Sequence, residues 1–178
     1  IYAAVYDRYK VVAIDGDGNC IEVIWANEMG KTHNGGREDV IHPMAVTTRT
    51  VGTNDYLIVT GFEQWCTRYK RNGRCQNNSF KRYQPIMYSR NLTTGEEVNC
   101  ALDNRHRGFA EGAWSITMDD GNYLYYAANG VIHRLGLTEQ GGTYCPVGDV
   151  YVYPPSEHNG AEEIDIDPQD EDIMYNLS

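Results

Sequence analysis

The chain has 178 residues, of which 41% are hydrophobic, and it carries a formal net charge of -10. A mean hydropathy of -0.56 argues against a membrane-spanning protein, and the length is sufficient for one domain with a sizeable core. The negative charge disfavours nucleic acid as a partner, because a polyanion would be repelled. No charged segment followed by an apolar segment opens the chain, which predicts that residue 1 is a processed or internal terminus.

Short apolar runs separated by turn residues predict β-strands in the first 41 residues. Three strands are expected at Tyr2 to Tyr6, Lys10 to Ile14 and Cys20 to Ala26, followed by an outer strand at Glu38 to Ile41. Together they would form one antiparallel meander.

The turn at Asp15 to Asn19 copies the first three ligand positions of an EF-hand calcium loop. The glycine required at position six of such a loop is replaced by Cys20, and the bidentate glutamate at position twelve is replaced by Ala26. Asp and Gly are also the residues that hairpin turns need. We therefore interpret this segment as a hairpin turn.

A second unit is predicted to begin at His42. Its strands are expected at 42–47, Asp55 to Thr60, Pro85 to Asn91 and Glu96 to Leu102. Residues 61–83 are predicted to be an insertion that interrupts the unit, because they contain two cysteines and a cluster of basic residues.

A third unit, Gly112 to Tyr153, reads as a complete four-stranded meander. Its strands are expected at Trp114 to Met118, Tyr123 to Ala128, Val131 to Leu135 and Asp149 to Tyr153. Trp114, Ile116 and Met118 alternate with polar residues, which predicts that all three share one buried face. The pair Asn129-Gly130 predicts a type I′ hairpin turn, since both residues tolerate positive φ.

The sequence Gly112 to Asp119 resembles Gly160 to Asp167, 48 positions later. A repeat of this length is typical of β-propeller blades. The chain then divides into units 1–41, 42–111 with the insertion at 61–83, 112–159, and an incomplete 160–178. We predict a single all-β domain, a partial β-propeller of about three and a half blades, which is either one fragment of a longer chain or is completed by further copies or a second chain. The alternative is a β-sandwich or irregular barrel built from the same hairpins.

Gly112 to Leu137 and Asn159 to Tyr175 resemble the generic propeller blades of NHL repeats and gluconolactonase-like enzymes. The resemblance covers about half of the chain and implies an architecture, with no particular activity. Asn159-Gly160 is similar to the Asn-Gly pair that, in gluconolactonase-like enzymes, contributes an asparagine to a central metal. The resemblance therefore implies Asn159 as a candidate metal ligand.

The compartment is predicted from sequons and cysteines. Sequons for N-glycosylation occur at Asn77, Asn91 and Asn176. Cys66 and Cys75 flank a short polar loop, and a disulfide between them would stabilise the fold by roughly 2.5 to 3 kcal/mol. These features predict a secreted, extracellular glycoprotein.

The remaining cysteines are Cys20, Cys100 and Cys145. Because their number is odd, one of the three must be a free thiol or bond to another chain. The sequence alone leaves open which two of them pair. No C-x-x-C spacing occurs, which argues against a zinc ribbon or a thioredoxin-like redox site.

In a propeller, the loops that lead into the first strand of each blade converge at one mouth of the central channel. The polar residues of these loops are His42, Asn104, His106, Glu111, His158, Asn159 and Glu163. His42, His106, His158 and Asn159 are candidate ligands of a divalent metal such as Ca²⁺ or Zn²⁺. His106, Glu111 and His158 are candidate catalytic residues. The alternative is that they are solvated loop residues and that no cofactor is bound.

The insertion gathers basic and aromatic residues on an otherwise acidic chain. The residues predicted to bind a ligand or partner are Arg68, Tyr69, Lys70, Arg71 and Arg74. Such a patch suits a sulfated glycan, an anionic partner, or the acidic tail of a neighbouring subunit. The alternative is a solvated loop that its charges keep soluble.

Two functions follow from these patterns. The first is a secreted, glycosylated binding protein, lectin-like or partner-assembling, whose Tyr- and Trp-lined loops hold the ligand. The second is a metal-dependent propeller enzyme of the lactonase or esterase type. No Gly-x-Ser-x-Gly, His-Glu-x-x-His or phosphate-binding glycine motif supports the enzyme.

Overall fold

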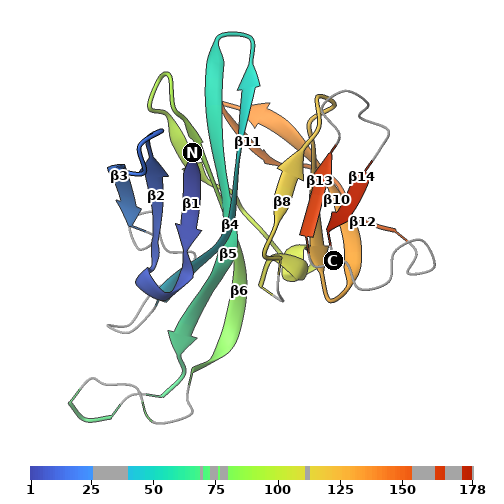
Figure 1. The fold of residues 1–178 in the computed structure, drawn as a ribbon. Helices are drawn as coiled ribbons and strands as arrows, with labels where there is room; N and C mark the ends of the chain where they lie inside the picture. The colour runs from blue at the N-terminus through green and yellow to red at the C-terminus, as the bar shows by residue number, and fades with distance from the viewer. Residues whose placement is uncertain are drawn as a thin grey trace.

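The computed structural model of the chain describes residues 1–25, 40–68, 70–72, 76, 80–110, 113–153, 163–166 and 174–177. Within these residues, antiparallel strands form four sheets, and both helices are short 3-10 helices (Figure 1). The prediction of an all-β fold is therefore confirmed. None of the helices in the described ranges is long and apolar enough to span a bilayer.

The first sheet contains β1 (Tyr2–Val5), β2 (Lys10–Ile14) and β3 (Cys20–Trp25), in that order. The helix η1 (Tyr6–Arg8) connects β1 to β2. Between β2 and β3, the carboxylate of Asp15 accepts hydrogen bonds from the main-chain nitrogens of Asp17 (3.0 Å) and Asn19 (2.8 Å). These bonds hold a hairpin turn, as the sequence predicted.

The second sheet contains β4 (Val40–Val51), β5 (Asn54–Cys66), β6 (Phe80–Asn91) and β7 (Glu97–Asn99), in that order. The prediction of an outer strand at Glu38 to Ile41 in the first unit is wrong, because Val40 and Ile41 belong to β4 and pair with β5. The predicted insertion at 61–83 is also shorter than expected. β5 and β6 continue to pair as far as Cys66 and Phe80, because Phe62 and Cys66 are buried and extend the packed surface of the hairpin.

The third sheet contains β8 (Ile116–Met118), β9 (Tyr123–Ala128), β10 (Val131–Gln140), β11 (Thr143–Pro146) and β12 (Tyr151–Val152). The predicted Asn129-Gly130 turn is confirmed, with φ of 54° and 73°. β11 was not predicted. It pairs with β10 through a tight turn at Gly141 and Gly142, both of which have positive φ.

The fourth sheet is a hairpin of two strands, β13 (Glu163–Ile166) and β14 (Met174–Leu177). A second 3-10 helix, η3 (Asn104–Ala110), precedes the third sheet and was not predicted. Each sheet falls within one of the four predicted units, except that β4 begins two residues before residue 42.

The first three sheets pack face to face, and the side chains of β5 point alternately to the two neighbouring sheets. Leu57 and Val59 face the first sheet, where they pack in one core cluster with Val11. Ile58 points the other way, into a second cluster that contains Leu124 of the third sheet. Because the centre of β5 is buried on both faces, residues 56–59 form a continuous apolar run, as expected for a strand between two layers.

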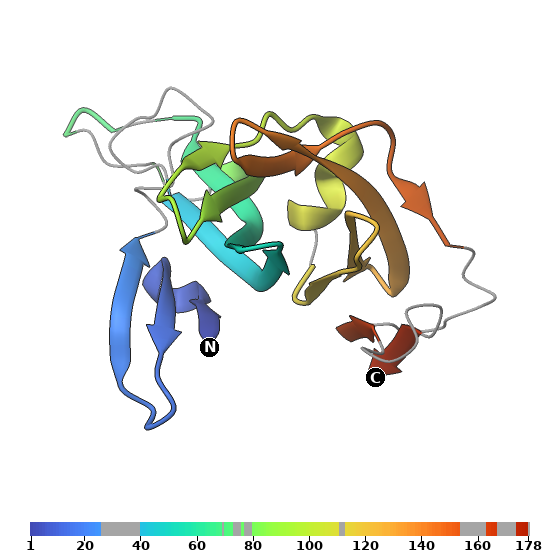
Figure 2. The same ribbon diagram turned by 90° about the horizontal axis from the view of Figure 1, so that it is seen from above.

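The first strands of the four sheets lie next to one another in chain order. β1 lies beside β4, β4 beside β8, and β8 beside β13. Figure 2 shows the sheets fanned out from blue to red around this inner edge. The described strands form an open series and not a closed ring.

Side-chain contacts and a disulfide connect neighbouring sheets in the described part of the chain. Arg90 on β6 pairs with Glu22 on β3 at 3.0 Å. Arg49, at the end of β4, donates to the main-chain oxygens of the turn between β8 and β9, at Asp119 and, at 2.8 Å, Asp120.

A disulfide also joins the second and third sheets, between Cys100, just after β7, and Cys145 on β11. It settles which two of the three remaining cysteines pair and leaves Cys20 as an exposed free thiol.

Candidate functional site

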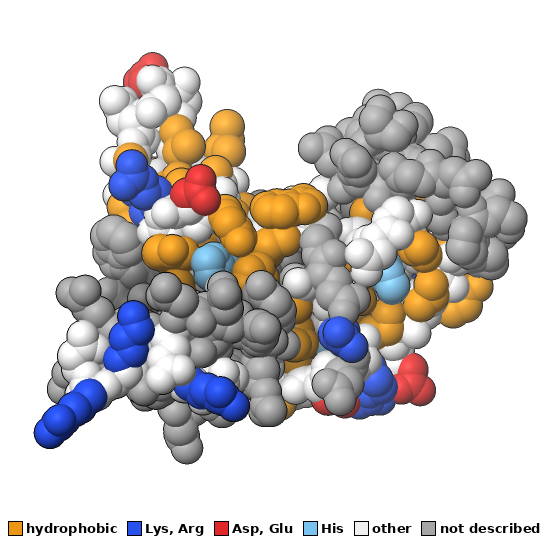
Figure 3. Space-filling view, turned by 90° about the horizontal axis from the view of Figure 1, so that it is seen from below, with side chains coloured by type: hydrophobic (Ala, Val, Ile, Leu, Met, Phe, Trp, Pro, Cys, Tyr) orange, Lys and Arg blue, Asp and Glu red, His pale blue; other side chains and the backbone are white. Residues whose placement is uncertain are grey.

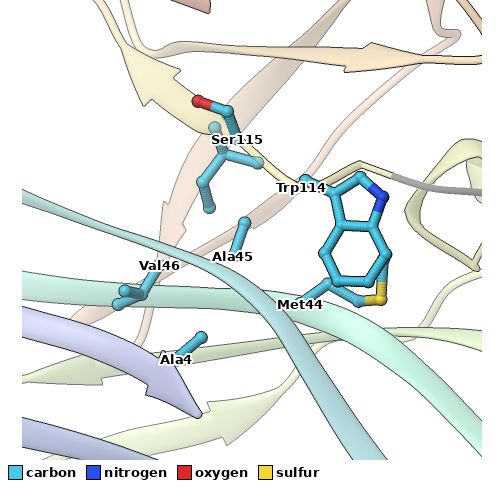
Figure 4. Close-up of a pocket in the computed structure, with 7 residues that line it drawn as sticks. Ala4, Met44, Ala45, Val46, Trp114 and Ser115 are labelled. Atoms are coloured by element: carbon cyan, nitrogen blue, oxygen red, sulfur yellow. The ribbon is translucent and has the colours of Figure 1, made fainter. Parts of the chain in front are cut away.

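An open groove of about 220 Å³ lies where the first three sheets meet (Figure 4). Its lining residues come from β1, from β4, and from the segment that leads into β8. They are Ala4, Met44, Ala45, Val46, Trp114, Ser115 and Ile116. None of them carries a charge at neutral pH, so the groove suits a neutral ligand.

The strands that line the groove each pair on one side only within the described residues. β1 pairs with β2, β4 with β5, and β8 with β9. The other edge of such a strand presents main-chain N–H and C=O groups that no neighbouring strand uses. The groove therefore offers hydrogen-bonding groups of both kinds.

An irregularity in β4 shapes one wall of the groove. The register with β5 shifts between Pro43 and Ala45, which places Met44 in a bulge. On β5, Gly61 lies so close to β4 that a Cβ atom there would be 2.0 Å from the carbonyl oxygen of His42. Only glycine permits this approach, and bulges of this kind commonly re-aim side chains beside binding sites.

Aromatic rings extend from the groove across the three sheets. Trp114, 58% exposed, contacts Tyr6 of η1, with ring centroids 5.5 Å apart. Tyr6 in turn contacts His42 at 4.9 Å, and His42 stacks on Phe62 at 4.6 Å. Tyr9 closes the group with an edge contact to His42 at 4.9 Å. We call Tyr6, Tyr9, His42, Phe62 and Trp114 the aromatic cluster.

Trp114 is the exposed end of this cluster. The prediction that it shares a buried face with Ile116 and Met118 is wrong, because β8 begins only at Ile116. Ala113 and Ile116 are buried on either side, while the indole turns outward to the groove. An exposed, braced indole beside unused main-chain groups is an arrangement that binds flat apolar ring faces.

His42 lies at the buried end of the cluster and is 8% exposed. Burial lowers the pKa of its imidazole, and this outweighs its hydrogen bond with the Gln64 side chain and the charge of Asp7, which raise the pKa. Nδ1 is buried without a hydrogen-bond partner. His42 is thus a neutral, packed histidine and not a solvated loop residue.

His106 also has a packing role. It lies in η3, only 4% exposed, and its ring stacks over Phe109 with centroids 6.5 Å apart. Its Nδ1 accepts a hydrogen bond from the main-chain nitrogen of Asp103 at 3.1 Å, which ties the start of the helix to the preceding loop. The expectation of a solvated histidine does not hold here either.

The predicted metal and catalytic residues are not brought together within the described part of the chain. His42 packs in the aromatic cluster, whereas His106 packs against Phe109. No three His, Cys, Asp or Glu side chains in the described ranges are placed to hold a metal ion. The other candidates, Glu111, His158 and Asn159, lie outside the described residues, so their roles stay predictions.

The predicted partner-binding residues are described in part. Arg68, Lys70 and Arg71 are exposed beyond the end of the β5–β6 hairpin. Tyr69 and Arg74 lie outside the described residues. Cys66 is disulfide-bonded. The predicted Cys66–Cys75 pairing stays a prediction, because Cys75 is also outside the described residues.

Asn91 is the sequon whose side chain the structure places. It is 1% exposed, and its Oδ1 accepts hydrogen bonds from the main-chain nitrogens of Thr93 (2.9 Å) and Thr94 (3.1 Å). Its Nδ2, the atom that would carry a glycan, donates to the carbonyl oxygen of Gly142 at 3.3 Å. This geometry does not favour glycosylation at Asn91. The side chains of Asn77 and Asn176 lie outside the described part of the chain.

Sequence reasoning did not identify the groove or Trp114 as its exposed platform. The abundance of tyrosine indicated aromatic loops, but no motif marked Tyr6, His42 and Trp114 as neighbours. Comparison with known proteins gives no further guide, since no family model, curated protein or solved structure matches the chain.

Proposed function

We propose that the protein is a carbohydrate-binding protein that holds a sugar ring in the groove between β1, β4 and β8. The observation that carries this proposal is the exposed indole of Trp114, braced by Tyr6 at the rim of an uncharged groove. A pyranose ring has an apolar C–H face that packs on an indole, while its hydroxyl groups need donors and acceptors of both kinds. The unused main-chain groups of three edge strands can supply these.

The size of the groove limits the ligand. At about 220 Å³ it is smaller than the roughly 300 to 1,000 Å³ of pockets that bury drug-sized ligands. One sugar ring, with any further rings projecting into solvent, fits this volume better than a large cofactor does. The openness of the groove to solvent also suits the end or side of a longer glycan.

A glycan panel tests the proposal. Purified protein is applied to immobilised neutral mono- and oligosaccharides, and the Kd of any ligand found is measured for the wild type and for Trp114→Ala. We expect Trp114→Ala to weaken binding at least about tenfold, as the loss of a central aromatic contact does. Tyr151→Ala is the matched control, because Tyr151 is also a half-exposed aromatic residue but lies on β12. No retained glycan, or equal loss in both variants, would contradict the proposal.

The protein is further proposed to be a secreted glycoprotein. The Cys100–Cys145 disulfide and the bonded Cys66 support an oxidising compartment, where disulfides persist. Intact mass before and after enzymatic deglycosylation and reduction is the test. A mass that equals the bare chain under all conditions would contradict glycosylation.

The arc of sheets is proposed to be part of a β-propeller that further copies or a second chain complete. Support comes from the face-to-face packing of the first three sheets and from the adjacency of β1, β4, β8 and β13. Light scattering at several protein concentrations measures the assembly, and a mass of more than one chain is expected. A single-chain mass at all concentrations, with no co-purifying protein, would contradict it.

We do not extend the proposal to a metal-dependent lactonase or esterase. No observation within the described residues favours that activity, since the candidate histidines found there are packed apart from one another.

A further inference from the structure

A second surface, distinct from the groove, lies beyond the end of the β5–β6 hairpin. It consists of Arg68, Lys70 and Arg71, which we call the cationic tip. All three side chains are exposed, and the hairpin carries them away from the other sheets (Figure 1). Figure 3 shows Lys and Arg side chains gathered at this end of the molecule.

The base of the cationic tip is held in place. Cys66, the last residue of β5, is buried and disulfide-bonded. Two residues later, the carbonyl oxygen of Arg68 accepts a hydrogen bond from the main-chain nitrogen of Gln76 at 2.9 Å. This bond joins the two arms of the loop and holds the main chain of Arg68 in position.

The cations of the tip differ from the arginines of the sheets. Arg90 pairs with Glu22, and Arg105 pairs with Asp103 (2.7 Å) and Asp149 (2.5 Å). Arg134 is stacked between the rings of Tyr123 and Tyr151.

By contrast, Arg68, Lys70 and Arg71 have no ion pair with any carboxylate in the described part of the chain. On a protein with a net charge of -10, three exposed cations within four positions make this tip locally positive.

Charge complementarity therefore favours an anionic partner. The types and the spacing of the three side chains indicate which class of anion it is. Two of the three groups are guanidinium ions, whose planar donors bind oxyanions such as sulfate in pairs. Three cations so close together are best matched by a polymer with closely spaced strong anions, since each contact releases condensed counterions. A disulfide-bonded protein meets such polymers outside the cell as sulfated polysaccharides.

We propose that the cationic tip binds a sulfated polysaccharide through Arg68, Lys70 and Arg71. The acidic body repels the same polymer, so the ligand contacts the protein at the tip and leaves the groove free. The two sites would then hold different parts of a glycan, or two different glycans.

Binding of the full chain to heparin, measured by titration calorimetry at several salt concentrations, tests this proposal. For three contacts, the affinity of the wild type should fall by a factor on the order of tens between 50 and 200 mM salt. The affinity of the triple variant Arg68→Gln/Lys70→Gln/Arg71→Gln should be at least about tenfold lower, with a shallower salt dependence.

Matched single variants are Arg71→Gln and Arg107→Gln. Arg107 is an exposed arginine on η3, and its replacement makes the same change in charge. Only the first should weaken binding.

The outcomes separate this proposal from its competitors and from the proposed function of the groove. Trp114→Ala should bind heparin as the wild type does, so a failure of the groove proposal leaves this one testable. Equal affinity for heparin and for its desulfated form would overturn the proposal, as would unchanged binding by the triple variant. Tighter binding to a polyglutamate peptide than to heparin would overturn it in favour of an acidic protein partner.

Discussion

Gly108 in η3 lies against the ring of Tyr126 on β9, so closely that a Cβ atom at residue 108 would be 2.7 Å from Cε2 of Tyr126. Tyr126 is fully buried, touches Phe109 at 4.6 Å between ring centroids, and stacks on His133 at 4.8 Å. The ring therefore has no room to retreat. This contact fixes η3 on the third sheet, just before the segment that carries Trp114 into the groove.

We expect Gly108→Ala to destabilise the fold. The added methyl group must displace the Tyr126 ring, and overpacking of this kind costs roughly 1 to 3 kcal/mol. The gain of up to about 1 kcal/mol that Ala usually brings over Gly is too small to offset it. The free energy of unfolding, from denaturant titration, checks the result. Equal or greater stability of the variant would show that the ring can move.

Tyr126→Phe and Tyr88→Phe should have opposite consequences, although both rings are buried. The hydroxyl of Tyr126 has no hydrogen-bond partner, and burial raises its pKa. Its removal should leave stability unchanged or raise it, because a buried unpaired polar group is lost.

The hydroxyl of Tyr88 instead donates to Oε2 of Glu97 at 2.5 Å, so its loss should cost about 1 to 3 kcal/mol. The same denaturant titration compares the two variants. A larger loss for Tyr126→Phe than for Tyr88→Phe would contradict this reading of the core.

Replacing Cys100 and Cys145 by alanine should destabilise the protein by about 4 kcal/mol in the loop-entropy model, since the disulfide closes a loop of 45 residues. It also joins the end of the second sheet to β11 of the third. Cys20→Ser is the control and should unfold at the wild-type denaturant concentration, because Cys20 is exposed and unpaired. A similar loss in both variants would rule out a specific role of the disulfide.

His42 should make stability depend on pH below neutrality. Its pKa is lowered in the folded state by burial, so the unfolded chain takes up the proton first as the pH falls through about 6.5. The contribution of neutral His42 to the free energy of unfolding is complete above this pH and is lost below it. The free energy of unfolding changes by at most about 1.4 kcal/mol per pH unit for this one group.

Unfolding free energies of the wild type and of His42→Phe, measured between pH 7.5 and 5.5, check this. The difference between the two should shrink or reverse towards acid pH. A difference that stays constant over this range would contradict the pKa shift.

Peptide mass spectrometry of the protein from a eukaryotic secretory host should find Asn91 unmodified. Its Nδ2 is buried and bonded to Gly142, and a glycan would have to break this contact. Asn91→Ala should cost roughly 1 to 3 kcal/mol, because the main-chain nitrogens of Thr93 and Thr94 lose their acceptor. An occupied Asn91 in folded protein would show that this turn can form without it.

Much of the local structure could be predicted because its causes are local. Short apolar runs between turn residues marked β1, β2 and β9, and the positive φ that Asn129 and Gly130 tolerate marked the hairpin between β9 and β10. Strand ends were less predictable, as β5 and β6 show, because their length depends on what the extended hairpin packs against.

The sequence by itself determined an acidic, all-β chain of successive meanders, with a basic loop and an odd cysteine. Only the tertiary structure decided which cysteines pair, that His42 is buried, and that Trp114 is exposed beside β1 and β4. The physical reason is distance along the chain. Turn and strand preferences act over a few residues. The groove, in contrast, forms where edge strands from three separate sheets meet, and a local sequence pattern does not indicate which sheets pack against each other.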